Sequence, residues 1–317
     1  MKIINNIIFW FKNSRPYTIP ITTLNFLVVF VYALFNNGNI TTGILAYIGV
    51  SLVHLATNLS DDYFDYKKLI NNSDFCAKDC KCAYLRDGRA TICDLRNTII
   101  IMISVAGLIG LILFFMAGFY VILFALAMLP IAVFYSKLSS KGLGDLAVIT
   151  AYGPLMYGGV YYVMTKSLCA EVFILSLACA IIVETVLYAH MLMDFKDDID
   201  ANKTTLCTKL KTPQNALKFL LGLYICAYIF MTIFAQVSNN YNVLITLMIV
   251  PLVIKLYKSL KLYNQDSSIL PEISIWNFPL NKNKQLPINA PFFHRFFLSI
   301  NISTVFMLLT CLGIILK

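Results

Sequence analysis

Two clusters of oxygen-bearing side chains stand at the ends of long apolar stretches, NLSDDYFDYK in the first half of the sequence and HMLMDFKDDID in the second. Their members fall at helical spacing: His54, Asn58, Asp62 and Asp65, then His190, Asp194 and Asp198. Carboxylates at a helix C-terminus face one another and the negative end of the helix dipole, so a cation is needed. Mg²⁺ takes oxygen ligands and completes its shell with water and phosphate. Two opposed clusters therefore predict a Mg²⁺-dependent receptor for a diphosphate.

The alternative interpretation is that these acids are solvated loop charges. Lysines close in sequence could then neutralise them in surface pairs that contribute little: Lys67, Lys68, Lys196 and Lys203. That interpretation suits one acidic loop, whereas two clusters at matching helix ends favour a shared metal site.

The elements that must position these clusters are membrane spans. The 317 residues are 59% hydrophobic and only 13% charged, with a mean hydropathy of +0.75, whereas a soluble chain carries about 25% charge. Apolar runs near the length that crosses a bilayer recur along the chain. We therefore expect an all-α polytopic membrane protein with nine transmembrane helices, at about 17–36, 40–59, 98–116, 119–135, 144–164, 170–193, 215–236, 242–260 and 296–316.

The distribution of positive charge predicts the orientation. With the N-terminus in the cytoplasm, all of the 25 Lys and Arg residues except Lys166 and Lys317 fall on the cytoplasmic side. This asymmetry explains the net charge of +9 without nucleic-acid binding, and it places both acidic clusters on the cytoplasmic face. Residues 1–20 lack the layout of a signal peptide, and we expect an amphipathic segment at the membrane surface.

The cysteines give a weak signal. Cys76, Cys80 and Cys82 cluster in a polar loop, but their spacing is poor evidence for a metal site. Free thiols are the favoured interpretation.

The motifs and their order resemble the UbiA superfamily of intramembrane aromatic prenyltransferases, and within it the 1,4-dihydroxy-2-naphthoate polyprenyltransferases of menaquinone synthesis. Asn58-x-x-x-Asp62-x-x-Asp65 has the spacing of that branch. The second cluster with its trailing ANKTTL is similar to the D-x-x-x-D loop of the family. SRPYTIP before the first span and KGLGDLAVITAYGPLMYGGVYYV at 141–163 are similar to further segments of the branch, whereas 262–295 is longer than expected.

The resemblance implies one intramembrane prenyltransferase domain over 1–317, with two pseudo-repeated halves and acidic loops near 58–96 and 194–214. It implies Mg²⁺-dependent transfer of a polyprenyl group from polyprenyl diphosphate to an aromatic quinone precursor, with 1,4-dihydroxy-2-naphthoate as the expected acceptor. The implied metal ligands are Asn58, Asp62, Asp65, Asp194 and Asp198, of which the four aspartates are also catalytic. The implied substrate-binding residues are Asn58, Lys141, Lys203 and Arg86.

For several residues the sequence allows both a functional role and an ordinary structural one. Asp145 is a candidate base or positioning group, or a helix-start acid favoured by the dipole. Arg86 and Arg89 can hold phosphate, but ordinary cytoplasmic loop charge is favoured. For His54 and His190 we favour hydrogen bonds to a neighbouring helix over contact with the acceptor.

The rival function is a cation- or proton-coupled transporter, because ionisable groups inside a membrane mark ion pathways. Glu184, in the middle of its span, is the residue that supports this rival. Transporters usually place such groups near the midplane, whereas most acids here lie at span ends. A UbiA-type enzyme with a different acceptor is a further alternative.

Overall fold

The computed structural model describes residues 2–71, 82–200, 203–281 and 286–317, and this described part is helical without strands. The helices are α1 (Lys2–Asn13), α2 (Ile19–Leu34), α3 (Ile40–Asn71), α4 (Ala83–Arg86), α5 (Ile92–Ala117), α6 (Tyr120–Ser139), α7 (Gly144–Thr150), α8 (Met156–Thr165), α9 (Ala170–Met193), α10 (Phe195–Asp200), α11 (Leu206–Lys209), α12 (Pro213–Val237), α13 (Val250–Gln265) and α14 (Ala290–Ile315). Turns of 3₁₀ or π type add η1 (Pro16–Thr18), η3 (Ala151–Leu155), η4 (Tyr241–Ile249) and η5 (Ile275–Asn277).

Eight helices in the described residues are long and apolar enough to cross a membrane, and they correspond to eight of the nine predicted spans. The prediction of nine is not confirmed, because the remaining segment, 144–164, is divided among α7, η3 and α8. Pro154 has no amide hydrogen for the helical ladder, and Gly153 has non-helical dihedral angles (φ −102°, ψ −110°). These two residues produce a π-helical break inside an otherwise continuous helical path.

The break is held by polar contacts from α2. The Asn25 side-chain amide donates to the Tyr152 carbonyl at 2.7 Å, and the Tyr157 hydroxyl donates to Asn25 Oδ1 at 3.1 Å. Gly153 lets this segment approach α9, because a Cβ there would lie 2.9 Å from the Cβ of Ala180. The fifth predicted span is thus fixed to α2 on one side and to α9 on the other.

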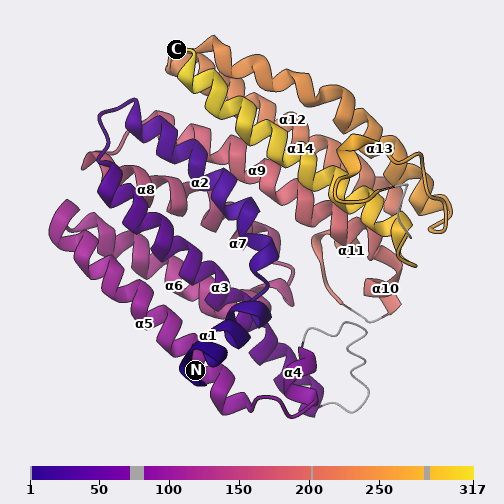
Figure 1. The fold of residues 1–317 in the computed structure, drawn as a ribbon. Helices are drawn as coiled ribbons and strands as arrows, with labels where there is room; N and C mark the ends of the chain where they lie inside the picture. Colours follow the sequence, from indigo (N-terminus) through magenta and orange to yellow (C-terminus); the bar gives the residue numbers. More distant parts are fainter. Residues whose placement is uncertain (1, 72–81, 201–202, 282–285) are drawn as a thin grey trace.

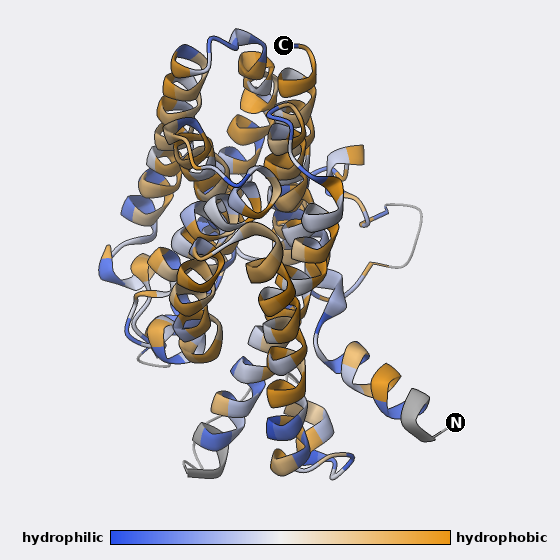
Figure 2. Cartoon of the chain, turned by 90° about the vertical axis from the view of Figure 1, so that its left-hand side faces the viewer, coloured by the Kyte–Doolittle hydropathy of each residue, from blue (hydrophilic) through white to orange (hydrophobic). Residues whose placement is uncertain are grey.

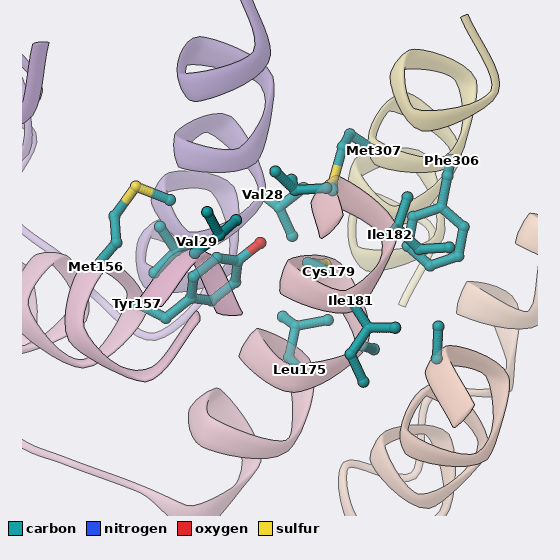
Figure 3. Close-up of a cluster of buried hydrophobic side chains, with 14 of the residues drawn as sticks. Val28, Val29, Met156, Tyr157, Leu175, Cys179, Ile181, Ile182, Phe306 and Met307 are labelled. Atoms are coloured by element: carbon teal, nitrogen blue, oxygen red, sulfur yellow. The ribbon is translucent and has the colours of Figure 1, made fainter. Parts of the chain in front are cut away.

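The core is built around α9, the most enclosed of the candidate spans. Its apolar window is 78% buried, whereas that of α5 is only 11% buried. Helices α2, α8 and α14 pack against α9, and Figure 3 shows their side chains meeting around it. The labelled residues of this cluster are Val28, Val29, Met156, Tyr157, Leu175, Cys179, Ile181, Ile182, Phe306 and Met307. Figure 2 shows hydrophobic colouring along the long helices and hydrophilic colouring at many of the connections, which suits a bundle immersed in lipid.

Helix α1 has two different faces. Trp10 is buried against Tyr84 of α4, with ring centroids 5.7 Å apart, whereas Ile7, Ile8 and Phe11 are exposed. This arrangement fits the amphipathic segment predicted for the N-terminus. It also ties α1 to the chain that follows the first acidic cluster.

Both acidic clusters lie at the same end of the bundle. In Figure 1, α4 follows the end of α3, and α10 and α11 follow the end of α9, at the lower right of the view. Helix α3 continues to Asn71, so the first cluster lies on a helix and not in a loop that begins near residue 58. The reason is that no Gly or Pro interrupts the sequence between Gly49 and Gly88.

Candidate active site

One face of α3 forms hydrogen bonds with the turn between α1 and α2 and with the start of α2. His54 Nε2 lies 3.0 Å from the Thr18 hydroxyl, and His54 Nδ1 also contacts the Thr22 hydroxyl. The Asn58 side-chain amide donates to the Ser14 carbonyl at 2.9 Å and to the Thr18 hydroxyl at 3.1 Å. The shared face predicted from helical spacing is therefore confirmed for His54 and Asn58. The prediction that His54 hydrogen-bonds a neighbouring helix is also confirmed.

Asp62 is fully buried and is engaged by two protein donors. Arg15 forms an ion pair with Asp62 Oδ1 and donates to the Asn58 carbonyl at 3.0 Å. The Tyr84 hydroxyl donates to Asp62 Oδ2 at 2.9 Å. Sequence reasoning missed both partners. Arg15 stands inside the SRPYTIP segment, which the sequence singled out only as a motif, and no sequence signal identifies Tyr84.

Asp65, one turn further along α3, faces α6. The Ser136 hydroxyl donates to Asp65 Oδ1 at 3.4 Å. Lys137 lies 4.9 Å from the ring centroid of Phe64, which is a cation–π contact beside the same carboxylate. A basic group from the last turn of α6 therefore lies close to the first cluster.

The second cluster surrounds the end of α9. His190 Nδ1 lies 3.0 Å from Asp194 Oδ2, so the prediction that His190 hydrogen-bonds a neighbouring helix is wrong; its ring instead packs 5.0 Å from that of Phe292 on α14. Lys203 donates to Asp198 Oδ1 at 3.0 Å. Asp198 Oδ2 is buried and lacks a hydrogen-bond partner within the described chain. Burial raises the pKa of Asp198, and Lys203 opposes that rise.

Three carboxyls lie within electrostatic range of the thiol of Cys207 on α11. Burial raises the pKa of Cys207 to about 12, and a contact with Tyr188 opposes this rise. The negative charges of Asp145, Asp198 and Glu184 raise this pKa further. The fold thus brings the mid-span acid of α9 and the first acid of α7 close to the second cluster.

The turn before α7 contacts the second acidic loop directly, because Lys209 donates to the Gly142 carbonyl at 3.3 Å. Lys141 in the same turn is exposed. Asp145 is half-buried, and its Oδ1 atom is buried without a hydrogen-bond partner among the residues that the structure describes. The segment 141–145 therefore lies between the helix bundle and the loop of the second cluster.

The structure does not assemble every predicted site residue. Within the described ranges, no group of three or more His, Cys, Asp or Glu residues is arranged to hold a metal ion. Arg86 is exposed, and Arg89 pairs with Asp87 at 3.1 Å with both side chains more than half exposed, as expected for loop charge. Cys76 and Cys80 lie outside the described residues.

The chain belongs to the UbiA prenyltransferase family, whose pattern matches residues 22–277. It is therefore a prenyltransferase and an integral membrane protein. Family membership favours the enzyme over the transporter that Glu184 had left open.

Relatives with stated activities cover most of the chain. A 1,4-dihydroxy-2-naphthoate octaprenyltransferase of Haemophilus influenzae is 22% identical over 260 residues, covering 78% of this chain and 83% of its own. The enzyme with the same description from Escherichia coli is 25% identical over 236 residues, covering 70% and 75%. A solved structure described as a digeranylgeranylglyceryl phosphate synthase in membranes superposes with a TM-score of 0.63 at 16% identity, covering 99% of this chain and 100% of the other. That likeness shows a shared fold.

Proposed function

We propose that this prenyltransferase transfers a polyprenyl group from polyprenyl diphosphate to 1,4-dihydroxy-2-naphthoate, a step of menaquinone synthesis, with Mg²⁺ as cofactor. The bacterial relatives carry this activity in their descriptions. The observation that carries the proposal is the position of the two acidic helix ends, which come from distant parts of the chain and lie at one end of the bundle.

The diphosphate binds between these helix ends, with its isoprenoid tail in the apolar interior. Lys203 already lies against Asp198 and can turn one of its three donors toward a phosphate oxygen. Lys141 is exposed beside the same loop and can approach the same oxygens. Arg86, exposed on α4, is a further candidate from the side of the first cluster. These cations favour the charge that builds on the leaving group.

The available donors fit Mg²⁺, which prefers oxygen ligands and needs only one or two carboxylates when phosphates complete its shell. Asp198 offers a buried oxygen that has no hydrogen-bond partner among the described residues, and Asp194 and Asp65 stand on the two helix ends. Asn58 and Asp62 contact the N-terminal segment, so they must exchange those partners before they can bind metal. Bound Mg²⁺ would supply Lewis-acid stabilisation of the leaving diphosphate.

The reaction breaks the bond between the first prenyl carbon and the diphosphate oxygen, and the electron pair leaves with the diphosphate. The allylic cation that remains must be kept from water, which the enclosed core around α9 achieves. A ring carbon of the acceptor forms the new carbon–carbon bond, and the acceptor's carboxylate leaves as CO₂. Asp145, at the start of α7, acts as a base or positions the acceptor. The site opens to the cytoplasm, the face to which charge asymmetry assigns both clusters.

The test is a transfer assay with purified protein, radiolabelled polyprenyl diphosphate, Mg²⁺ and 1,4-dihydroxy-2-naphthoate. Lipid-soluble product should form. It should fall by at least about 100-fold with EDTA, which removes the metal ion, and in Asp194→Asn and Asp198→Asn, which each replace a charged ligand by a neutral one. Glu171→Gln, in the first turn of α9 at the opposite membrane face, is the matched control and should keep its activity. Product formation unchanged in both aspartate variants would contradict the metal assignment.

A further inference from the structure

Glu184 is a buried acid that the proposed reaction has not used. It lies on α9 ten residues before Asp194, which corresponds to about 15 Å along the helix toward the membrane interior. Its side chain is 1% exposed. Both of its carboxyl oxygens are buried, and neither has a hydrogen-bond partner in the described part of the protein.

The polar group that interacts with Glu184 is also an acid. The carboxyl of Glu184 lies beside that of Asp145, close enough for the two to share a proton. Asp145 Oδ1 is likewise buried and lacks a partner among the described residues. A single shared proton makes one hydrogen bond between the two carboxyls and leaves their other oxygens as acceptors without a donor. The Tyr135 side chain of α6 lies within electrostatic range of both acids.

A buried pair of acids is unfavourable unless a hydrogen-bond donor contacts its free oxygens. A buried polar group without a hydrogen-bond partner destabilises the folded protein, because it has lost its bonds to water and gained none in exchange. Buried polar atoms in native proteins are nearly always hydrogen-bonded, so exceptions point to a missing partner. The partner that fits here is a hydrogen-bond donor that does not need water around it.

We propose that Glu184 and Asp145 form a subsite that accepts a hydrogen bond from a ring hydroxyl of the aromatic acceptor. This inference rests on the proposed function and adds to it the requirement for a hydroxylated ring. Diphosphate is excluded from the pair by its own negative charge, and an isoprenoid tail has no donor. A phenolic hydroxyl is a neutral donor on an apolar ring, and so it suits both the acids and the core around them.

The place of the pair suits this role. Glu184 lies further into the membrane than Asp194 at the end of the same helix, and α7, which carries Asp145, packs against α9, so the pair lies on the inner side of the second acidic cluster. An acceptor held there lies next to the diphosphate end of the prenyl substrate. A hydrogen bond from its hydroxyl to a carboxylate also increases electron density in the ring, which favours attack on a carbocation. The proton stays on the hydroxyl oxygen, and no transfer is required.

The test compares the binding of two fluorescent probes, 4-hydroxy-2-naphthoate and 2-naphthoate, to the purified protein. The hydroxyl of the first probe is not adjacent to its carboxylate, so it cannot be satisfied internally. Wild-type protein should bind the hydroxylated probe about 10- to 100-fold more tightly, the range expected for a hydrogen bond to a charged group. Glu184→Met should abolish this preference, with the Kd of 2-naphthoate changed by less than about threefold. Glu184→Gln keeps a neutral acceptor and should give an intermediate preference.

The control is Glu171→Met at the other end of α9, which should keep the wild-type preference. A preference that survives intact in Glu184→Met overturns the subsite. Should Glu184→Met not fold, an unchanged preference in Glu184→Gln overturns it equally. Failure of the proposed function looks different: 1,4-dihydroxy-2-naphthoate would give no prenylated product, while the Glu184-dependent preference between the probes remained.

Discussion

Removal of the Arg15 side chain is the sharpest perturbation that the structure suggests. Arg15→Ala leaves the fully buried Asp62 without its cation, and the loss of one member of a buried ion pair costs about 3–5 kcal/mol. Arg15 is 18% exposed, and Asp62 keeps the hydrogen bond from Tyr84 at 2.9 Å. The lower value, about 3 kcal/mol, is therefore expected.

The consequence should be local, because the pair joins the α1–α2 turn to α3. Helix α1 contains Lys12, which is exposed but lies within the helix, so cleavage after it requires α1 to open. A lysine-specific protease retains this cleavage site in the variant. If opening is fast relative to cleavage, about 3 kcal/mol increases the cleavage rate at Lys12 by about 100-fold. Mass spectrometry of the released N-terminal peptide measures this rate.

Arg89→Ala provides the matched control, since it removes an arginine whose pair with Asp87 is more than half exposed. Its effect on cleavage at Lys12 should stay below about threefold, because exposed pairs contribute little. The double variant Arg15→Ala with Asp62→Asn should be less open than Arg15→Ala alone, because no unpaired charge remains. If Arg15→Ala and Arg89→Ala open α1 equally, the buried pair does not hold the N-terminal segment.

Three further predictions concern substitutions that each alter one contact seen in the structure. Tyr84→Phe removes the other donor to the same buried carboxylate. It should speed cleavage at Lys12 by about 10- to 100-fold, from the roughly 1.5–3 kcal/mol typical of a charged hydrogen bond, and an unchanged rate would count against that bond. Gly153→Ala should lower the melting temperature, because overpacking costs about 1–3 kcal/mol, whereas Gly159→Ala meets only ordinary contacts and should melt as wild type does. Asn25→Ala should also lower the melting temperature, by leaving a buried carbonyl without its donor, at about 1–3 kcal/mol; an unaltered melting curve would refute that role.

The sequence by itself determined the helical membrane architecture. Apolar runs of bilayer length and a one-sided distribution of Lys and Arg are local properties of the chain, and eight of the nine predicted spans appear as continuous helical segments long enough to cross a membrane. The remaining predicted span, 144–164, shows the limit of this reasoning. Hydropathy averages over a window, so it reports that 144–164 is apolar, but it does not report that Gly153 and Pro154 break the helix there.

The shared face of the first cluster was also readable from sequence, because helical spacing alone places His54, Asn58 and Asp62 together. What that face contacts was decided only by the tertiary structure. The partners of Asp62 are 47 and 22 residues away along the chain, and no periodic pattern links them to it.

The pairing of Glu184 with Asp145 depended still more on the fold. In sequence they are acids on different spans, and one of them suggested an ion pathway. Only the packing of α7 against α9 brings their carboxyls together. Spacing fixes which residues share a face of one helix, whereas the packing of helices fixes which faces meet.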